Sequence, residues 1–225
     1  MSLVVCQNVT KKFKVRGGCK VVLNRVNLSL DKGETALITG RNGAGKSVFL
    51  SLVSGLDRPS GGEICWRNRR YSDLSNHQLS RLRACEIGMI FQNHNLIPSW
   101  TALENVEAGM IHMSCSHRKR RDAAMEWLSE AGLQDKMDEL PHQLSMGEQQ
   151  RVAVVRTLIR KPQLVLADEP TGDLDEETAQ VIVQMLTRAV RENQSSFLIA
   201  THGNFPTSFN AKYIMQLRDG MLVPE

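Results

Sequence analysis

The amino-acid sequence predicts an α/β fold with an open-sheet core, an antiparallel β portion and an inserted helical subdomain. Three observations predict it. Four short apolar runs, each as long as a buried strand, end on a glycine or on a polar side chain. The first run enters a glycine-rich loop that is followed by an apolar helix. A long stretch with helix caps and helical periodicity separates the second run from the third, and this is where a subdomain is expected.

The glycine-rich loop reads GRNGAGKS from Gly40 to Ser47 and fits the P-loop pattern G-x-x-x-x-G-K-[ST]. Glycines at 40, 43 and 45 allow a tight turn that brings backbone N–H groups close to a polyphosphate. The helix that begins near Gly45 adds the positive end of its dipole. Lys46 can reach the β and γ phosphates, and the Ser47 hydroxyl can ligate Mg²⁺. An ordinary glycine turn is the alternative, and the flanking strand and helix disfavour it.

Composition limits the class of protein. The chain has 225 residues and a formal net charge of +4, too small by itself to indicate nucleic-acid binding. Its five cysteines include no C-x-x-C pair, so we expect free thiols in a reducing compartment rather than disulfides or a metal site. We also expect neither a signal peptide nor a transmembrane helix, because no apolar run is long enough for either. Any role at a membrane is therefore expected to pass through a partner.

The first third of the chain is predicted to be mainly β. Residues 3–13 and 21–30 have strand patterns, and VRGGCK between them is a turn. DKGE is expected to form a hairpin-type turn into the strand at 35–40. After the apolar helix that starts at Ser47, a loop at 58–62 leads to a further short strand, GEICW.

The middle of the chain begins with a polar stretch at 74–83 and a buried strand at 87–92. Thr101 is a plausible helix N-cap, with Glu104 at the capping-box spacing. Residues 117–133 are predicted to form an amphipathic helix. Its apolar side carries Ala124, Trp127, Leu128 and Ala131.

The last third alternates strands and helices. Buried strands are expected at 163–170 and 196–202, with a helix at 175–192 between them. AKYIMQLRDGMLV is expected to form two short strands about an Asp-Gly turn. The expected organisation is a single domain over residues 1–225, with a nucleotide-binding core at 1–92 and 161–225 and a helical subdomain at 93–160.

The four apolar strands end at Gly40, Gln92, Asp168–Glu169 and His202. Since ligands of open α/β sheets sit at the carboxyl ends of the strands, these ends are expected to converge on one nucleotide. Asp168 can hold Mg²⁺, and Glu169 can orient or deprotonate the attacking water. Gln92 can bridge the metal and the water, and His202 can contact the γ phosphate. Taken alone, Gln92 and His202 are equally consistent with ordinary structural residues at strand ends.

The stretch LSMGEQQRVAV, 144–154, places Ser145 and Gly147 at a helix start, where backbone N–H groups suit an anion. The chain already has a phosphate-binding loop, so a second anion site requires a second nucleotide. We therefore expect a dimer in which Ser145 and Gly147 cap the phosphate held by the other subunit. The alternative is an ordinary helix with Ser145 as N-cap and Glu148 at the capping-box position.

The motifs GRNGAGKS, Gln92, LSMGEQQR, LVLADEPTGDLD and ATH, in this order, resemble the nucleotide-binding subunit of an ABC transporter over nearly the whole chain. The segments SGLDRPSGGEI, IGMIFQNHNLIPSWTALENV and LADEPTGDLD resemble its lipoprotein-releasing, macrolide-export and cell-division branch. The resemblance implies an ABC ATPase fold, with ATP and Mg²⁺ as ligands and a homodimer across two ATP sites. It also implies a peripheral protein on the cytoplasmic face of the inner membrane. An integral membrane permease is expected to contact residues 92–100.

The resemblance also implies roles for individual residues. Phe13 would stack on adenine, Gln92 would be the lid glutamine, and Ser145 and Gly147 would belong to the signature that closes on the opposite ATP. Asp168 would be the metal carboxylate, Glu169 the general base and His202 the switch histidine. Asp175 would lie in the loop that crosses the dimer interface. The nucleotide-binding segment would comprise Gly40, Arg41, Asn42, Gly43, Ala44, Gly45, Lys46, Ser47 and Val48, with Ser47, Gln92 and Asp168 at the metal.

Four positions depart from the family pattern. Phe13 stands where tyrosine is more usual, and Val48 replaces a common threonine. Met146 replaces the first glycine of the signature pair, where a side chain could strain the close approach of two subunits. Gly203 replaces an aspartate that commonly follows the histidine. Hydrolysis is still expected, because Lys46 and the catalytic residues are retained.

Two points stay open at the level of sequence. Leu96, Ile97 and Trp100 are candidates for the permease contact, and subdomain core is the equally weighted alternative. The function is expected to be ATP hydrolysis that drives lipoprotein release or efflux-type mechanotransmission. An ATP-driven regulatory switch of the cell-division type, without a transported substrate, is the alternative. A soluble ABC ATPase acting on nucleic acid is disfavoured because the chain has neither a second cassette nor long insertions, and the basic runs 67–70 and 117–121 are short.

Overall fold

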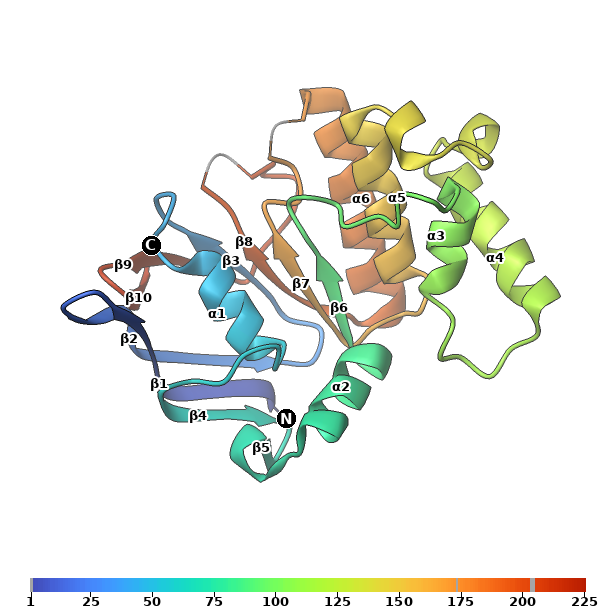
Figure 1. Ribbon diagram of the computed structural model, residues 1–225. Helices are drawn as coiled ribbons and strands as arrows, with labels where there is room; N and C mark the ends of the chain where they lie inside the picture. Colours follow the sequence, from blue (N-terminus) through green and yellow to red (C-terminus); the bar gives the residue numbers. More distant parts are fainter. Residues whose placement is uncertain (1, 173, 203–204) are drawn as a thin grey trace.

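A six-stranded sheet forms the centre of the computed structural model, which describes residues 2–172, 174–202 and 205–225 (Figure 1). Five of its strands run parallel, and the last hairpin adds one antiparallel edge strand. In spatial order they are β10 (Met221–Pro224), β9 (Tyr213–Arg218), β3 (Thr35–Thr39), β8 (Ser196–Ala200), β7 (Leu164–Asp168) and β6 (Ile87–Ile90). The expected buried strands are thus confirmed, and so is the Asp-Gly turn, where Asp219 and Gly220 both have positive φ. Gly203 lies outside the described residues.

The antiparallel portion is a separate sheet in the order β2-β1-β4-β5. Its strands are β1 (Ser2–Val15), β2 (Gly18–Asp31), β4 (Gly61–Trp66) and β5 (Arg69–Arg70). The turn predicted between β1 and β2 is confirmed, and it joins the two strands in an antiparallel hairpin. The hairpin-type turn predicted at DKGE is wrong, because β2 and β3 belong to different sheets and do not pair. The chain crosses there from one layer to the other through Gly33, whose φ is 79°.

Helix α1 (Lys46–Val53) lies between the two sheets (Figure 1). Phe49, Leu52 and Val53 on this helix are fully buried and belong to one apolar cluster with side chains of both sheets. The opposite face of the parallel sheet is covered by α5 (Met146–Leu158) and α6 (Glu176–Asn193), whose apolar sides form a second cluster with β7 and β8. Packing on both faces explains why the parallel strands read as continuous apolar runs.

Residues 93–160 contain α3 (Ala102–Ala108), α4 (His117–Glu130) and α5. Thr101 caps α3 in a capping box with Glu104, as predicted. Ala124 and Leu128 of α4 are buried in a third cluster, while Trp127 is half-buried beside it. Because α5 contributes to both the second and the third cluster, it joins the helical region to the core. The division of the domain at residues 92/93 and 160/161 stays a proposal.

Helix α2 (Asn76–Cys85) was not indicated by the sequence pattern, which showed only a polar stretch. Its start is fixed by a capping box between Ser75 and Gln78. Only Leu79 and Leu82 are buried on this helix, too few to produce a recognisable apolar periodicity.

All five cysteines are free thiols. No helix among the described residues combines the length and the apolar character that crossing a bilayer requires.

Candidate nucleotide site

The loops that follow β3, β6, β7 and β8 enclose a cavity of about 520 Å³ at one edge of the parallel sheet. The four strand ends therefore do converge, as expected. The cavity is lined by residues of β2, of the glycine-rich loop and of the segments at the ends of β6, β7 and β8. The predicted residues that line the cavity are Asn42, Gly43, Gly45, Lys46, Ser47, Val48, Gln92, Asp168, Glu169 and His202.

Glycine is required at two positions of the loop. Gly40 has a φ of 149°, and a Cβ atom there would lie 2.7 Å from the Leu217 carbonyl oxygen. Gly45 has a φ of 107°, and its Cβ atom would lie 2.9 Å from Cγ1 of Val22. The loop can therefore approach β9 and β2 closely only without side chains at these points. This leaves the start of α1 open toward the cavity, where its backbone N–H groups suit a phosphate.

Lys46 is 6% exposed and has a carboxylate partner inside the site. Its Nζ donates to the Gly40 carbonyl oxygen at 2.7 Å and lies 3.5 Å from Oε1 of Glu169. The ammonium group is thus held where the loop would receive phosphate oxygens.

Glu169 is 7% exposed and has a φ of 49°, a conformation that few residues other than glycine adopt. Its backbone N–H donates to the Ala200 carbonyl oxygen at 2.9 Å. Its carboxylate lies 2.8 Å from Nδ1 of His202 and also accepts from the His202 backbone N–H. These contacts fix the carboxylate beside both Lys46 and His202. A carboxylate held in this way is suited to act as a general base.

Asp168 and Ser47 supply oxygen atoms suited to Mg²⁺. Burial raises the pKa of Asp168 above its ordinary value, while a hydrogen bond from Ser47 and the charge of Lys46 act in the opposite direction. Gln92 lines the same cavity. A hydroxyl, a carboxylate and an amide oxygen are the hard ligands that Mg²⁺ prefers, so the residues present fit the metal.

The remaining predicted residues do not line this cavity. Phe13 lies near the end of β1 and is 39% exposed. Arg41 is exposed and Ala44 is half-buried against the first apolar cluster. Ser145 and Asp175 are helix N-caps: Ser145 accepts from the Glu148 N–H of α5, and Asp175 from the Thr178 N–H of α6. The capping role that was the alternative for Ser145 is therefore present, and it leaves its predicted contact with a second nucleotide untested.

Three contacts were missed by sequence reasoning, two in or beside the cavity and one between α5 and α6. Val22 of β2 lines the cavity. Gln150 of α5 is 2% exposed and donates to the Pro170 carbonyl oxygen at 2.9 Å, next to Glu169. Gly147 packs so closely on α6 that a Cβ atom would lie 2.8 Å from Cγ2 of Thr178. Each joins segments far apart in the chain, so no local pattern could have indicated it.

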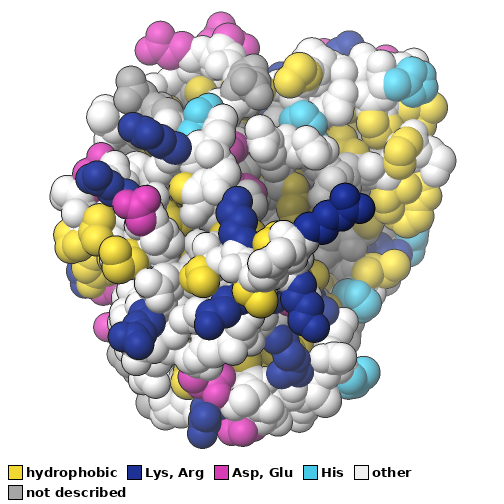
Figure 2. Space-filling model, turned by 60° about the vertical axis from the view of Figure 1, so that its left-hand side comes forward, with side chains coloured by type: hydrophobic (Ala, Val, Ile, Leu, Met, Phe, Trp, Pro, Cys, Tyr) yellow, Lys and Arg dark blue, Asp and Glu magenta, His cyan; other side chains and the backbone are white. Residues whose placement is uncertain are grey.

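The exposed part of the β1–β2 hairpin is basic and apolar. Lys12, Lys14, Arg16 and Lys20 are all exposed there. Figure 2 looks at the molecule from this side and shows basic side chains spread over the face, with uncharged, apolar and some acidic side chains between them. Such a distribution attracts a polyphosphate without forming a continuous basic track.

A second hollow, of about 400 Å³, lies where α2 and β6 face the residues that follow α3 and α5. Three arginines, Arg83, Arg156 and Arg160, line it. Each donates to main-chain carbonyl oxygens: Arg83 to that of Gly55, Arg156 to residues 94 and 95, and Arg160 to residues 83, 84 and 87. Within the described residues none of the three forms an ion pair with a carboxylate. The hollow is therefore positively charged and lacks counter-charges from this part of the chain.

The candidates for a permease contact are Leu96, Ile97 and Trp100. They lie in the chain between two segments that line this hollow, and they differ in burial. Leu96 is half-buried against the third apolar cluster, which favours the core alternative for this residue. The backbone of Ile97 is held on both sides by the Asn105 side chain. Trp100 is 37% exposed, and Ile111, which lines the hollow, is 59% exposed.

Comparison with known proteins gives consistent results. Residues 23–172 match a family model described as ABC transporter. The lipoprotein-releasing system ATP-binding protein LolD of Buchnera aphidicola is 38% identical over 200 residues, which cover 89% of this chain and 88% of the relative. The uncharacterized ABC transporter ATP-binding protein MJ0796 of Methanocaldococcus jannaschii is 39% identical over 222 residues, covering 97% and 94% of the two chains.

Solved structures of MJ0796 have the same fold. A dimeric structure of this cassette superposes with a TM-score of 0.91 at 38% identity, covering 97% of this chain and 96% of that one. A second dimeric structure, described as a post-hydrolysis state bound to ADP and Pi, has a TM-score of 0.89 at 37% identity and the same coverage. Both likenesses extend over nearly the whole chain.

Proposed function

The chain belongs to the ABC transporter family as an ATPase of that family, and from this premise we propose that it drives a membrane partner in lipoprotein release or efflux-type mechanotransmission. ATP would draw two copies together, and hydrolysis would release them. The observation that carries the proposal is the buried Glu169 carboxylate, placed beside Lys46 and His202 in a cavity at the end of a phosphate-binding loop.

Each residue of the cavity has a different proposed role in ATP hydrolysis. Glu169 accepts the proton of the attacking water as the water oxygen bonds to the γ phosphorus and the bond to the β–γ bridging oxygen breaks. Lys46 and the N–H groups at the start of α1 stabilise the charge on the phosphate oxygens. His202 orients the carboxylate through its Nδ1 and its backbone N–H. Ser47, Asp168 and Gln92 would hold Mg²⁺, which neutralises phosphate charge when bound.

The proposed dimer uses surfaces that lie outside the cavity. Ser145 and Gly147 would face the nucleotide of the second subunit, and Asp175 would lie at the contact between subunits. In support of this proposal, all three stand at the exposed or half-exposed starts of two adjacent helices, α5 and α6. The dimeric structures of MJ0796 support the same assembly by likeness. Phe13, exposed on the β1–β2 hairpin, would stack on adenine.

The membrane partner is proposed to contact residues 92–100 and the arginine-lined hollow beside them. Charge complementarity supports a cytoplasmic segment that carries a carboxylate, because three arginines there lack a carboxylate partner among the described residues. The protein would then be peripheral on the cytoplasmic side. Relatives named for lipoprotein release favour this reading over a regulatory switch of the cell-division type.

The test of the ATPase mechanism is Glu169→Gln, with Glu126→Gln of the exposed face of α4 as a control of equal charge change. Phosphate release should fall by about 100-fold or more, since general-base catalysis contributes at least that much. ATP binding should persist, and the ATP-bound dimer should survive gel filtration. Phosphate release above a tenth of the wild-type rate would show that Glu169 is not the base.

The partner is tested by affinity purification from membranes, with the co-purifying chain identified by mass. A partner with few transmembrane helices and a large extracytoplasmic domain supports the proposal. A partner whose many transmembrane helices form a closed path contradicts the branch assignment and leaves the ATPase mechanism intact. Ile111→Glu should abolish co-purification, whereas Met125→Glu, 42% exposed on α4, should not.

A further inference from the structure

The β1–β2 hairpin projects beyond the antiparallel sheet. Strand β1 pairs with β4 only as far as Thr10, so the hairpin from Lys11 onward has two strands. Register shifts in the β1–β2 pairing lie on both sides of Lys11. A two-stranded ribbon with an irregular register does not hold its direction strongly. Whatever fixes the root of the hairpin therefore fixes where Phe13 lies.

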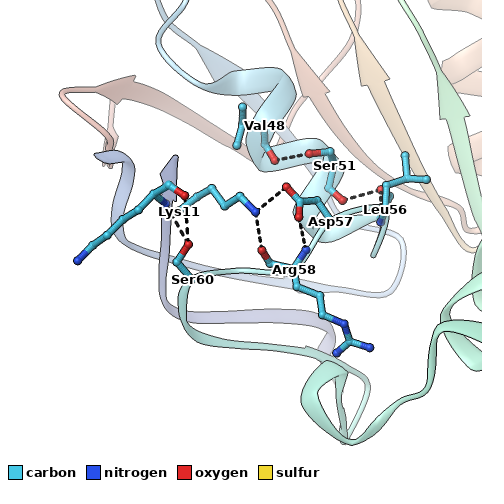
Figure 3. A network of polar contacts seen from close by, with 9 residues as sticks. Lys11, Val48, Ser51, Leu56, Asp57, Arg58 and Ser60 are labelled. Atoms are coloured by element: carbon cyan, nitrogen blue, oxygen red, sulfur yellow. Dashed lines mark hydrogen bonds and ion pairs between the residues drawn. The ribbon is translucent and has the colours of Figure 1, made fainter. Parts of the chain in front are cut away.

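Two sets of contacts tie this root to the loop after α1: the Lys12 N–H donates to Oγ of Ser60 at 3.1 Å, and the Lys11 side chain binds the residues before Ser60. Nζ of Lys11 lies 2.6 Å from Oδ2 of Asp57 and donates to the Arg58 carbonyl oxygen at 2.8 Å (Figure 3). The Lys11 side chain is only 12% exposed. The same Nζ lies 5.2 Å from the centre of the Phe13 ring. Lys11 therefore contacts both the Phe13 ring and the loop after α1.

Asp57 is itself placed by the helix of the phosphate-binding loop. The N–H groups of Leu56 and Asp57 both donate to the Ser51 carbonyl oxygen in α1. The Ser51 hydroxyl donates to the Val48 carbonyl oxygen at 2.8 Å, and Val48 lines the nucleotide cavity. Figure 3 shows this chain of contacts from Val48 to Lys11. It connects the cavity to the hairpin that carries Phe13.

We infer that the Lys11–Asp57 pair positions Phe13 relative to the phosphate-binding loop and thereby sets how much the nucleobase contributes to ATP binding. The inference rests on the proposed function, in which Phe13 stacks on adenine. Lys11 acts here through Phe13 and not on the phosphates. Loss of either partner loosens the root of the hairpin, so the stacking energy is lost while the phosphate contacts remain.

The experiment compares dissociation constants for ATP and for inorganic tripolyphosphate, which has no base, in the full chain with Mg²⁺. Lys11→Met and Asp57→Asn should each raise the Kd for ATP about fivefold to tenfold, the range of a lost aromatic stacking contact. The Kd for tripolyphosphate should change less than about twofold. The double variant Lys11→Asp with Asp57→Lys should recover part of the ATP affinity. Lys119→Met, an exposed lysine of α4, is the control of equal charge change and should behave like the wild type.

Five outcomes are decisive. Weaker ATP binding with unchanged tripolyphosphate binding in both single variants supports the inference. Equal weakening for the two ligands overturns it and indicates a general effect on folding. Tighter ATP binding in Asp57→Asn also overturns it, because a lysine freed of its counter-charge would then be touching the nucleotide directly. Phe13→Ala separates the two proposals. If Phe13→Ala weakens the binding of ATP but not of tripolyphosphate, and the Lys11 and Asp57 variants bind ATP normally, the inference alone fails. If Phe13→Ala has no effect, the placement of the base in the proposed function fails as well.

Discussion

Glu169 shows how a single residue is held for its role. Its positive φ costs energy in any residue with a side chain, so surrounding contacts must fix it. The backbone bond to Ala200 and the two contacts with His202 do so. The neighbouring Asp168 shows a related compromise, because burial raises its pKa while its proposed role requires a charged carboxylate.

Asp168→Asn is expected to stabilise the nucleotide-free protein against unfolding. It is also expected to abolish the dependence of ATP binding on Mg²⁺. An acid whose pKa is raised by folding opposes folding once the pH lies above its unfolded pKa, so an uncharged amide removes that opposition at neutral pH. The melting temperature at pH 7 should rise above that of the wild type. The difference from the wild type should shrink as the pH falls, and it should be lost below about pH 3, where the carboxyl is protonated in both states. A lower melting temperature at pH 7 would contradict this account.

At the scale of elements, the starts of α5 and α6 lie against each other. Gly147 of α5 meets Thr178 of α6, whose hydroxyl donates to Asp175 at 2.8 Å and so cannot easily rotate away. Gln150 connects the same helix to the segment that follows Glu169. The helix starts that are proposed to face the second subunit are therefore connected to the residue that follows Glu169, the proposed base, through the hydrogen bond of Gln150.

Gly147→Ala is expected to lower stability by about 1–3 kcal/mol, the usual cost of inserting a methyl group into a packed contact. This corresponds to a fall in melting temperature of about 2–4 °C for each kcal/mol in a chain of this size. The double variant with Thr178→Ala should recover most of the loss, since the clashing methyl group is gone. Thr178→Ala alone serves as the control for the lost cap contact. No recovery in the double variant would mean that another contact of Gly147 is responsible.

Met146→Gly tests the departure in the signature stretch. Met146 is 56% exposed in the single chain, so any strain it causes is expected only when two subunits approach. Phosphate release by the dimer should rise in the variant, while ATP binding by the single chain stays unchanged. A variant no faster than the wild type would refute the idea that this side chain slows turnover.

At the scale of the whole molecule, the second and third apolar clusters share side chains. Trp127 packs against both the second and the third cluster, as does Met185 of α6. Arg188 adds to the same contact, since it pairs with Glu130 of α4 and lies over the Trp127 ring. The helical region is therefore expected to unfold together with the core.

Leu128→Ala tests this coupling. Leu128 is fully buried in the third cluster, so its truncation should cost about 2–5 kcal/mol. Calorimetry should show a single transition that moves to lower temperature as a whole. Leu30→Ala, equally buried in the first cluster, should shift the same transition. Two separate transitions in Leu128→Ala would show that the helical region unfolds by itself.

The sequence alone determined the buried strands, the glycine-rich loop and the polar residues after the strands that meet in one cavity, while the roles of these residues stay proposals. These are local signals: an apolar run, a glycine pattern or a polar residue directly after a strand is readable in a few neighbouring positions. The same reasoning explains why the caps at Thr101 and Ser145 were predictable.

Only the tertiary structure decided the rest. Helix α2 has too few buried residues to be recognised, and the turn after β2 was misread because strand pairing depends on which sheet each strand joins. The contacts of Lys11 with Asp57 and of Gln150 with Pro170 depend on sheet register and on helix placement. Such contacts join residues that are distant in the chain, and their geometry exists only once the layers have packed against one another.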